Sequence, residues 1–420
     1  MRHNHIHLLA ILFMLCGMIQ TSCSTDDDTT PSTGQHETPS PTPTREEEDP
    51  YDAVLLSTVR YDELKTTAYN FEYNSQDPYG QPARLSAAIT IGDEVKKLER
   101  ARGLALYSHY SRYLPQQTPS QGDVSDPMIL HGSGLITISP DYYGFGSSGD
   151  HPQAYCMSIP NAQASVDALL AAKKLLPKLG YRWDDNVLFN IGYSQGGQTV
   201  MGIVKIITEQ HPEVKITWSI AGGGLYDMAL IYRQYIEMDM TTIPSAIVST
   251  ILSFREYCGI DIPYDQIFQG IVLENLDEWF LSRKYTLAEI DDDRMQHASA
   301  TTYLTPAMQD LESPVAKQFL EAFATDNLCT GWTPLKDEHI IIIHHSQDET
   351  VPYENAVAMY KFLHDEQGLK NVELSSKNWN QIGSHTAHET GAIHFGMEVL
   401  SKVCSTLGIL PWVNILDLNL

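Results

Sequence analysis

The chain has 420 residues, of which 42% are hydrophobic, and its 53 acidic residues against 27 basic ones give a formal net charge of −26. A chain of this length forms roughly two or three domains, or one large domain with an insertion. The acidic excess argues against nucleic acid as a partner, because binding nucleic acid requires a basic surface. It also argues against adsorption to anionic lipids through a polybasic patch.

The first 22 residues have the pattern of a signal peptide. Arg2 precedes an apolar run over residues 8–19, which is too short to cross a bilayer but suits the central region of a signal. No other stretch reaches 18 apolar residues, so we expect no transmembrane helix. The small residues Thr21 and Ser22 before Cys23 are similar to a lipoprotein signal, in which Cys23 is acylated. An ordinary secretory signal with an incidental cysteine is the alternative.

Residues 23–50 are predicted to be a flexible acidic tether. Residues 24–50 are rich in Ser, Thr, Pro, Asp and Glu and almost lack apolar side chains, so they cannot bury enough surface to offset the entropy of ordering. The acidic residues 26–28 resemble the surface-export signal of some Gram-negative lipoproteins, or they simply begin a solvated tether. We therefore expect an exported protein anchored to the outer membrane through its lipid alone, with surface exposure left open.

Residues 51–420 are predicted to form one domain, in which strand and helix patterns alternate from residue 66 onward. Short apolar runs bounded by turn residues predict strands at residues 69–73, 83–91, 103–107, 134–138, 186–191, 215–220, 339–344 and 372–376. Apolar residues at helical spacing predict helices at residues 161–179, 195–210, 353–363 and 391–407. Such alternation predicts an α/β fold, with a mostly parallel central sheet covered by helices on both faces.

The segment from about residue 225 to residue 330 interrupts this alternation. It contains several helical patterns and no convincing strand, so we expect a helical lid inserted between two strands of the sheet. Five aromatic residues supply apolar surface in this segment, namely Tyr232, Tyr235, Phe254, Trp279 and Phe280. For most of them a place in the core of the insertion is favoured over contact with a substrate.

The strongest chemical signal is the sequence GYSQG at residues 192–196, which fits the motif G-x-S-x-G. It directly follows a predicted strand and opens a predicted helix, as a nucleophile elbow requires. Gly192 and Gly196 allow the tight turn and the close approach of neighbouring backbone. Ser194 is therefore the candidate nucleophile, and the helix after it directs its N-terminus toward developing negative charge. The alternative is a glycine-rich turn with a buried serine.

A serine nucleophile needs a base, and the base needs an acid that orients it. In this fold class the acid and the base follow the serine in that order, each after a later strand. Asp348 lies just beyond the strongest strand pattern and is the candidate acid, with Glu349 as its competitor. His388 precedes the last helical pattern and is the candidate base, with His385 and His394 as alternatives.

An acyl-transfer site also needs backbone donors for the oxyanion. One candidate is the N–H group of Gln195, the residue after the nucleophile. The other should come from the loop after the strand at residues 103–107, which makes Tyr110 or Ser111 the candidate.

The histidines and cysteines do not form a recognisable metal site, so we expect no metal. Ala392 stands where the motif HExxH that starts at His388 would need its second histidine. His344 and His345 are adjacent on a strand and point to opposite faces. No C-x-x-C pair is present, and the pairing of four cysteines beyond the anchor is left open, namely Cys156, Cys258, Cys329 and Cys404.

Together these motifs resemble the α/β-hydrolase superfamily over residues 66–410. The sequence SPDYYGFGSS at residues 139–148 looks like the loop after the fourth core strand of that family. With GYSQGG, HHSQDETVP and HETGAIHF, the chain looks most like secreted lipases and esterases of the secretory-lipase type. The resemblance implies a triad of Ser194, Asp348 and His388, no cofactor and a helical lid. The usual His-Gly of the oxyanion loop reads His109-Tyr110 here, which leaves the second donor open.

The sequence thus predicts a serine hydrolase that cleaves carboxylic esters, with a small-molecule, lipid or glycan ester as substrate. A serine peptidase of the aminopeptidase or dipeptidyl-peptidase type is one alternative, because G-x-S-x-G-G also suits such enzymes. A non-catalytic surface lipoprotein that binds a ligand is the other. The acyl chain length and the alcohol are left open, because the shape of the lid would decide them.

Overall fold

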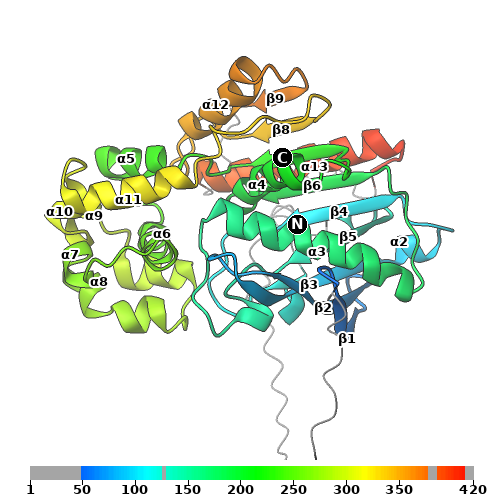
Figure 1. The fold of residues 1–420 in the computed structure, drawn as a ribbon, viewed down its shortest axis with the longest axis horizontal. Helices are drawn as coiled ribbons and strands as arrows, with labels where there is room; N and C mark the ends of the chain where they lie inside the picture. The colour runs from blue at the N-terminus through cyan, green and yellow to red at the C-terminus, as the bar shows by residue number, and fades with distance from the viewer. Residues whose placement is uncertain (1–48, 125–128, 377–385, 412–420) are drawn as a thin grey trace, which may run out of the picture.

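The computed structural model describes residues 49–124, 129–376 and 386–411. The predicted signal peptide, Cys23, nearly all of the tether and His385 lie outside the described residues. The described part contains a nine-stranded sheet with the strand order β1-β2-β3-β5-β4-β6-β7-β8-β9 (Figure 1). Its strands are β1 (Ala53–Tyr61), β2 (Thr66–Gln76), β3 (Pro82–Gly92), β4 (Gly103–Ser108), β5 (Leu135–Pro140), β6 (Leu188–Tyr193), β7 (Trp218–Gly222), β8 (Ile340–Ile343) and β9 (Val372–Ser375).

The sheet is mostly parallel, as the alternating pattern predicted. Strands β5, β4, β6, β7, β8 and β9 pair in parallel, whereas β1, β2 and β3 pair antiparallel and β3 joins β5 antiparallel. Strand β1 was not predicted. It is an edge strand that is exposed over most of its length, so its sequence lacks the alternation that marks a half-buried strand.

Helices cover both faces of the sheet, which explains the run of four isoleucines in β8. Ile340 and Ile342 lie in the apolar cluster that contains the buried side chains of α3 (Ser158–Lys178) and α4 (Gln195–Gln210). Ile341 and Ile343 lie in a second cluster with Phe395 and other residues of α13 (Ala387–Leu407). A strand buried on both faces carries apolar residues at every position rather than at alternate ones.

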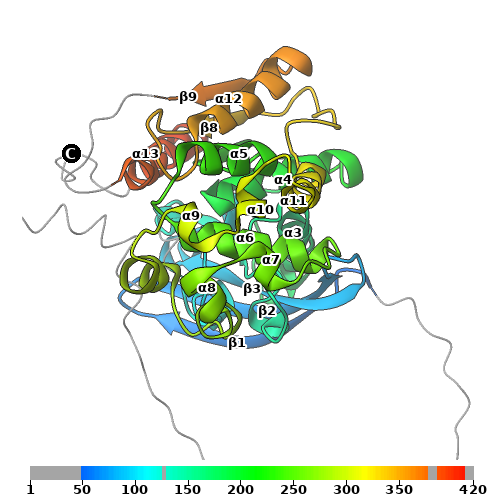
Figure 2. The same cartoon turned by 90° about the vertical axis from the view of Figure 1, so that its left-hand side faces the viewer.

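A helical insertion separates β7 from β8 in the sequence. It projects beyond one end of the sheet (Figure 1) and faces the viewer in Figure 2, and its described residues form no strand. Its helices are α5 (Met228–Met238), α6 (Pro244–Tyr257), α7 (Tyr264–Ile267), α8 (Gly270–Glu274), η5 (Asp277–Leu281), η6 (Glu289–Met295), α9 (Ala300–Tyr303), α10 (Pro306–Gln309) and α11 (Pro314–Thr325). The other short helices are α2 (Asp93–Lys96), η2 (Pro119–Gln121), η4 (Gly146–Ser148), α12 (Tyr353–Lys361) and η7 (Phe362–Glu366).

The buried apolar side chains of the insertion belong to the same core cluster as those of the sheet domain, and polar contacts also join the two. The five aromatic residues singled out in its sequence are all buried, as expected. Tyr113, in the loop after β4, donates a hydrogen bond to the Phe280 carbonyl at 2.9 Å. Arg283 donates to the Gly144 carbonyl at 2.6 Å, and burial lowers the pKa of this guanidinium. The insertion is thus tied to the loops that follow β4 and β5.

The four cysteines of the described residues are free thiols, so none of the three pairings left open by the sequence is formed. None of the helices in the described ranges combines the length and the apolar character needed to span a bilayer.

Candidate active site

Ser194 lies at a strained turn between β6 and α4. Its backbone has φ +56° and ψ −122°, a conformation that is uncommon for a residue with a side chain. The flanking glycines are required by space: a Cβ atom on Gly192 would collide with the Gly196 carbonyl, and one on Gly196 with the Ser108 carbonyl. The turn therefore has the form of the nucleophile elbow that the sequence predicted.

We expect the substitution Gly196→Ala to damage both the stability and the site. The added methyl group must push apart α4 and the end of β4, which should lower the free energy of unfolding by about 1–3 kcal/mol. Displacement of Ser194 should lower kcat/KM toward an acyl ester at least about tenfold. Gly180→Ala is the control for activity: its φ of +84° makes an alanine there costly to stability as well, but its Cβ would meet no atom within 4 Å, so kcat/KM should stay unchanged. A Gly196→Ala protein with wild-type kcat/KM would contradict the argument.

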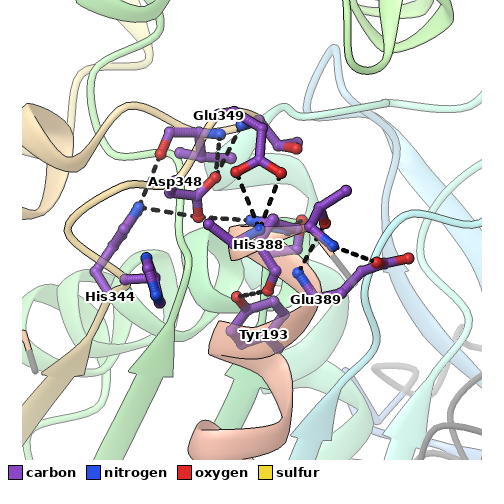
Figure 3. Close-up of polar contacts among 12 residues, drawn as sticks. Tyr193, His344, Asp348, Glu349, His388 and Glu389 are labelled. Carbon is purple, nitrogen blue, oxygen red and sulfur yellow. Dashed lines mark hydrogen bonds and ion pairs between the residues drawn. The ribbon is translucent and has the colours of Figure 1, made fainter. Parts of the chain in front are cut away.

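The structure brings together three residues that were singled out in the sequence. The Nδ1 atom of His388 lies 2.7 Å from Oδ2 of Asp348, and its Nε2 atom lies 3.2 Å from Oγ of Ser194. Ser194 follows β6, Asp348 follows β8, and His388 lies on α13 (Figure 3 shows the last two). With the Nδ1 proton donated to Asp348, Nε2 is left as the acceptor for the serine hydroxyl.

The position of His388 differs from the prediction in one respect. We expected it in a loop before a helix that starts at residue 391, but it lies in the first turn of α13. A capping box begins the helix earlier, because Thr386 accepts a hydrogen bond from the Glu389 N–H, and Glu389 accepts one from the Thr386 N–H. His394 lies within the same helix, as expected.

Asp348 is buried, and both of its carboxylate oxygens accept hydrogen bonds. Its Oδ1 accepts hydrogen bonds from the N–H groups of Thr350 at 2.9 Å and Val351 at 2.8 Å. Burial alone would raise the pKa of its carboxyl, but the charge and hydrogen bonds of His388 and His344 outweigh burial and hold it well below the ordinary value. Burial would lower the pKa of His388, but Asp348 and other nearby carboxylates raise it. The pair thus favours an ionised acid and stabilises an imidazolium.

His344 contacts Asp348, although the sequence predicted no role in catalysis for it. It is completely buried, and its Nε2 lies 2.8 Å from the Val351 carbonyl and 3.3 Å from Oδ2 of Asp348. In the sequence we considered His344 only as a metal ligand. Its position four residues before Asp348, at the end of a strand, was the available signal.

Glu349, the competing acid, faces a different group. Its two carboxylate oxygens accept the Ala387 N–H at 2.9 and 3.1 Å, while the neighbouring Asp348 meets the imidazole (Figure 3). Within the described ranges, no group of three or more His, Cys, Asp or Glu side chains is arranged to hold a metal ion.

The loop after β4 passes beside the elbow. A Cβ atom on Gly196 would meet the carbonyl groups of both Ser108 and His109, so the chain that leads to Tyr110 lies next to the start of α4. His109 is buried, which lowers its pKa to about 4, and its ring nitrogens lie 2.7 Å from the Tyr110 carbonyl and 3.2 Å from the Asp141 carbonyl. The hydroxyl of Ser111 pairs with that of Tyr155 at 2.8 Å. These contacts fix the segment that carries both oxyanion candidates.

Known structures share this fold. A protein of Legionella pneumophila superposes with a TM-score of 0.70 at 17% identity, covering 86% of this chain and 99% of that one. The rice cell wall degrading esterase LipA of Xanthomonas oryzae gives 0.69 at 21% identity, covering 85% and 97%. Lipase A of Candida antarctica in its closed state gives 0.60 at 15% identity, covering 87% and 84%. The chain therefore has the predicted α/β-hydrolase fold.

The sequence itself carries the family assignment. No curated protein matches it significantly. The family model for secretory lipases matches residues 126–399, which is well over half of the chain and includes the elbow, Asp348 and His388. The chain belongs to the secretory lipase family, whose members are carboxylic-ester hydrolases and whose secretory character indicates export.

Proposed function

We propose that the protein is a serine hydrolase that cleaves carboxylic esters through an acyl-enzyme intermediate. The observation that carries the proposal is the continuous contact from Ser194 Oγ through the His388 imidazole to the Asp348 carboxylate. The strained elbow that presents Ser194 adds to it, since such strain persists only where the surrounding structure enforces it.

In this mechanism His388 acts first as a base and then as an acid. Its Nε2 accepts the Ser194 proton while Oγ attacks the ester carbonyl carbon, and it returns that proton to the departing alcohol. Water then attacks the acyl-enzyme by the same route and releases the carboxylic acid. Asp348 holds the neutral imidazole in its Nδ1–H tautomer, which leaves Nε2 as the acceptor, and it stabilises the imidazolium that forms during each step.

The oxyanion of each tetrahedral intermediate needs donors that are in place before reaction. We assign them to the N–H of Gln195, at the start of α4, and to the N–H of Tyr110 or Ser111 in the loop beside it. The N-terminus of α4 also favours the developing negative charge.

We assign the helical insertion the role of a lid. Its contacts through Phe280 and Arg283 reach the loops after β4 and β5, and the first of these loops carries the oxyanion candidates. A segment attached there can control both the entry of substrate and the position of the loop that carries Tyr110 and Ser111. The substrate class we assign is a small-molecule, lipid or glycan ester, with the acyl group selected by this lid.

The anchoring of the enzyme rests on its sequence. We propose that Cys23 carries lipid and that residues 24–50 tether the catalytic domain to the outer membrane. Radiolabelled palmitate should enter the wild-type protein in Gram-negative cells and not a Cys23→Ser variant. Equal labelling of both would contradict the anchor without touching the proposed reaction.

A fluorophosphonate probe and a substrate panel test the proposed reaction. We expect one probe adduct per chain, on the peptide that contains Ser194, and hydrolysis of p-nitrophenyl acyl esters in preference to aminoacyl p-nitroanilides. Preference for the anilides would indicate a peptidase instead. Absence of both labelling and hydrolysis would indicate a ligand-binding protein.

A further inference from the structure

The helical turn that carries His388 is held from outside by Glu349, the residue next to the proposed acid. Both carboxylate oxygens of Glu349 accept the Ala387 N–H, at 2.9 and 3.1 Å. This N–H lies in the first turn of α13, where backbone donors have no partner within the helix. A carboxylate at a helix N-terminus is favoured by both the free donors and the helix dipole. Glu349 therefore binds the residue directly before His388.

The other side of the same turn is held by Tyr193, the residue next to Ser194. Its hydroxyl donates a hydrogen bond to the His388 carbonyl at 2.6 Å, and its ring lies 5.0 Å from the imidazole (Figure 3). Tyr193 and Glu349, the neighbours of the serine and of the acid, thus both form hydrogen bonds with the turn that carries His388. These bonds connect the ends of β6 and β8 to the start of α13, so the imidazole stays between Ser194 and Asp348.

Glu349 also adds negative charge near the imidazole. The groups that raise the pKa of His388 are Asp348, Glu349 and the helix residue Glu389. Tyr193, which packs on the imidazole from β6, is buried, and burial together with these carboxylates raises the pKa of its phenol well above the ordinary value, so it stays neutral. Asp348 makes the hydrogen bond to the imidazole, and Glu349 acts on it without one.

Glu349 is anchored to the insertion as well. Its backbone carbonyl accepts a hydrogen bond from the Thr242 hydroxyl at 3.1 Å, and Thr242 lies between α5 and α6 of the insertion. The same residue therefore contacts the base-bearing helix through its side chain and the insertion through its backbone.

We propose that Glu349 is a positioning residue for His388, which fixes the first turn of α13 and places a negative charge near the imidazole. The inference rests on the proposed hydrolase mechanism for its kinetic meaning. It predicts two separable effects, because Gln retains an acceptor for the Ala387 N–H but not the charge, whereas Ala removes both.

For Glu349→Gln we expect the acid limb of the kcat/KM profile to move to lower pH. Activity needs neutral His388 and is lost as pH falls through its pKa, which the Glu349 charge raises. Removing that charge lowers this pKa, so activity persists into more acidic solution, while the plateau at higher pH stays within about threefold of wild type. Glu354→Gln is the matched control, because Glu354 is exposed on α12 and is not among the groups that raise the His388 pKa.

For Glu349→Ala we expect, in addition, a fall of about ten- to a hundredfold in the plateau of kcat, since the imidazole loses its fixed geometry. Melting temperatures show whether each variant is folded at the assay temperature. An unchanged acid limb in Glu349→Gln would overturn the electrostatic part, and an unchanged plateau in folded Glu349→Ala would overturn the positioning part.

NMR titration of the His388 ring protons keeps this test independent of the proposed reaction. The His388 pKa should fall in Glu349→Gln relative to wild type and to Glu354→Gln, whether or not an ester is hydrolysed. If wild type neither hydrolyses esters nor reacts with fluorophosphonate, the proposed function fails while this comparison still stands or falls on its own. An unchanged titration would overturn the inference even in an active enzyme.

Discussion

Ser194→Ala should lower kcat/KM toward p-nitrophenyl acyl esters by about 10⁵- to 10⁶-fold, the range seen when a serine hydrolase loses its nucleophile. The Ser194 hydroxyl lies 3.2 Å from His388 Nε2 and is presented by a strained turn, and we expect no other hydroxyl of the described residues to replace it. The residual rate should reflect the oxyanion donors and substrate binding alone. Fluorophosphonate labelling should disappear together with the activity.

Ser405→Ala is the matched control for this substitution. Ser405 is an exposed serine near the far end of α13, and its hydroxyl donates a hydrogen bond to the Lys402 carbonyl at 3.0 Å. It should retain both hydrolysis and labelling. If Ser194→Ala, with an unchanged melting temperature, still cleaved the ester at the wild-type rate, the proposed mechanism would have to be abandoned.

Asp348→Asn should lower kcat by about 10⁴-fold, because the change reverses the hydrogen bond that selects the imidazole tautomer. The carboxylate accepts the His388 Nδ1–H at 2.7 Å, whereas an amide nitrogen turned toward the ring would donate to it. The remaining ring proton would then lie on Nε2, facing Ser194, and the base could not accept the hydroxyl proton. The backbone donors on Oδ1 would still find an amide oxygen, so the fold should survive.

Kinetics and ¹⁵N chemical shifts of the imidazole together check this prediction. The shifts should show the Nδ1–H tautomer in wild type and the Nε2–H tautomer in Asp348→Asn. Asp337→Asn is a suitable control, because Asp337 is exposed and its ion-pair partner, Lys215, is 3.8 Å away. A wild-type kcat in folded Asp348→Asn would point to Glu349 or another group as the acid.

The sequence was sufficient to predict the interior strands of the sheet and to single out the three residues of the proposed triad. Buried parallel strands such as β6 and β8 are short apolar runs, and the elbow demands glycines where any side chain would collide. Asp348 and Glu349 both follow β8, so the sequence left Glu349 as a competitor, and only their contacts separate the two. The contacts of Glu349 with α13 depend on tertiary structure, since residues 349 and 387 are 38 positions apart.

Other features were missed or misplaced. Strand β1 is exposed over most of its length, so it lacks the alternation that marks a half-buried strand. We predicted that α13 starts at residue 391, four residues too late, because we followed the apolar pattern. The capping box of Thr386 and Glu389 starts the helix before that pattern begins. His344 was passed over because its support for Asp348 depends on a backbone turn rather than on a motif.

The separation of Ser194 from His388 by 194 positions also sets the order in which the enzyme can mature. Contacts between distant segments form slowly, since the intervening chain must first close. A chain folded only through β7 would hold the proposed nucleophile without a base, and would be inert toward esters. Hydrolysis would then begin only after β8 and α13 have docked, which makes catalytic activity a late reporter of folding.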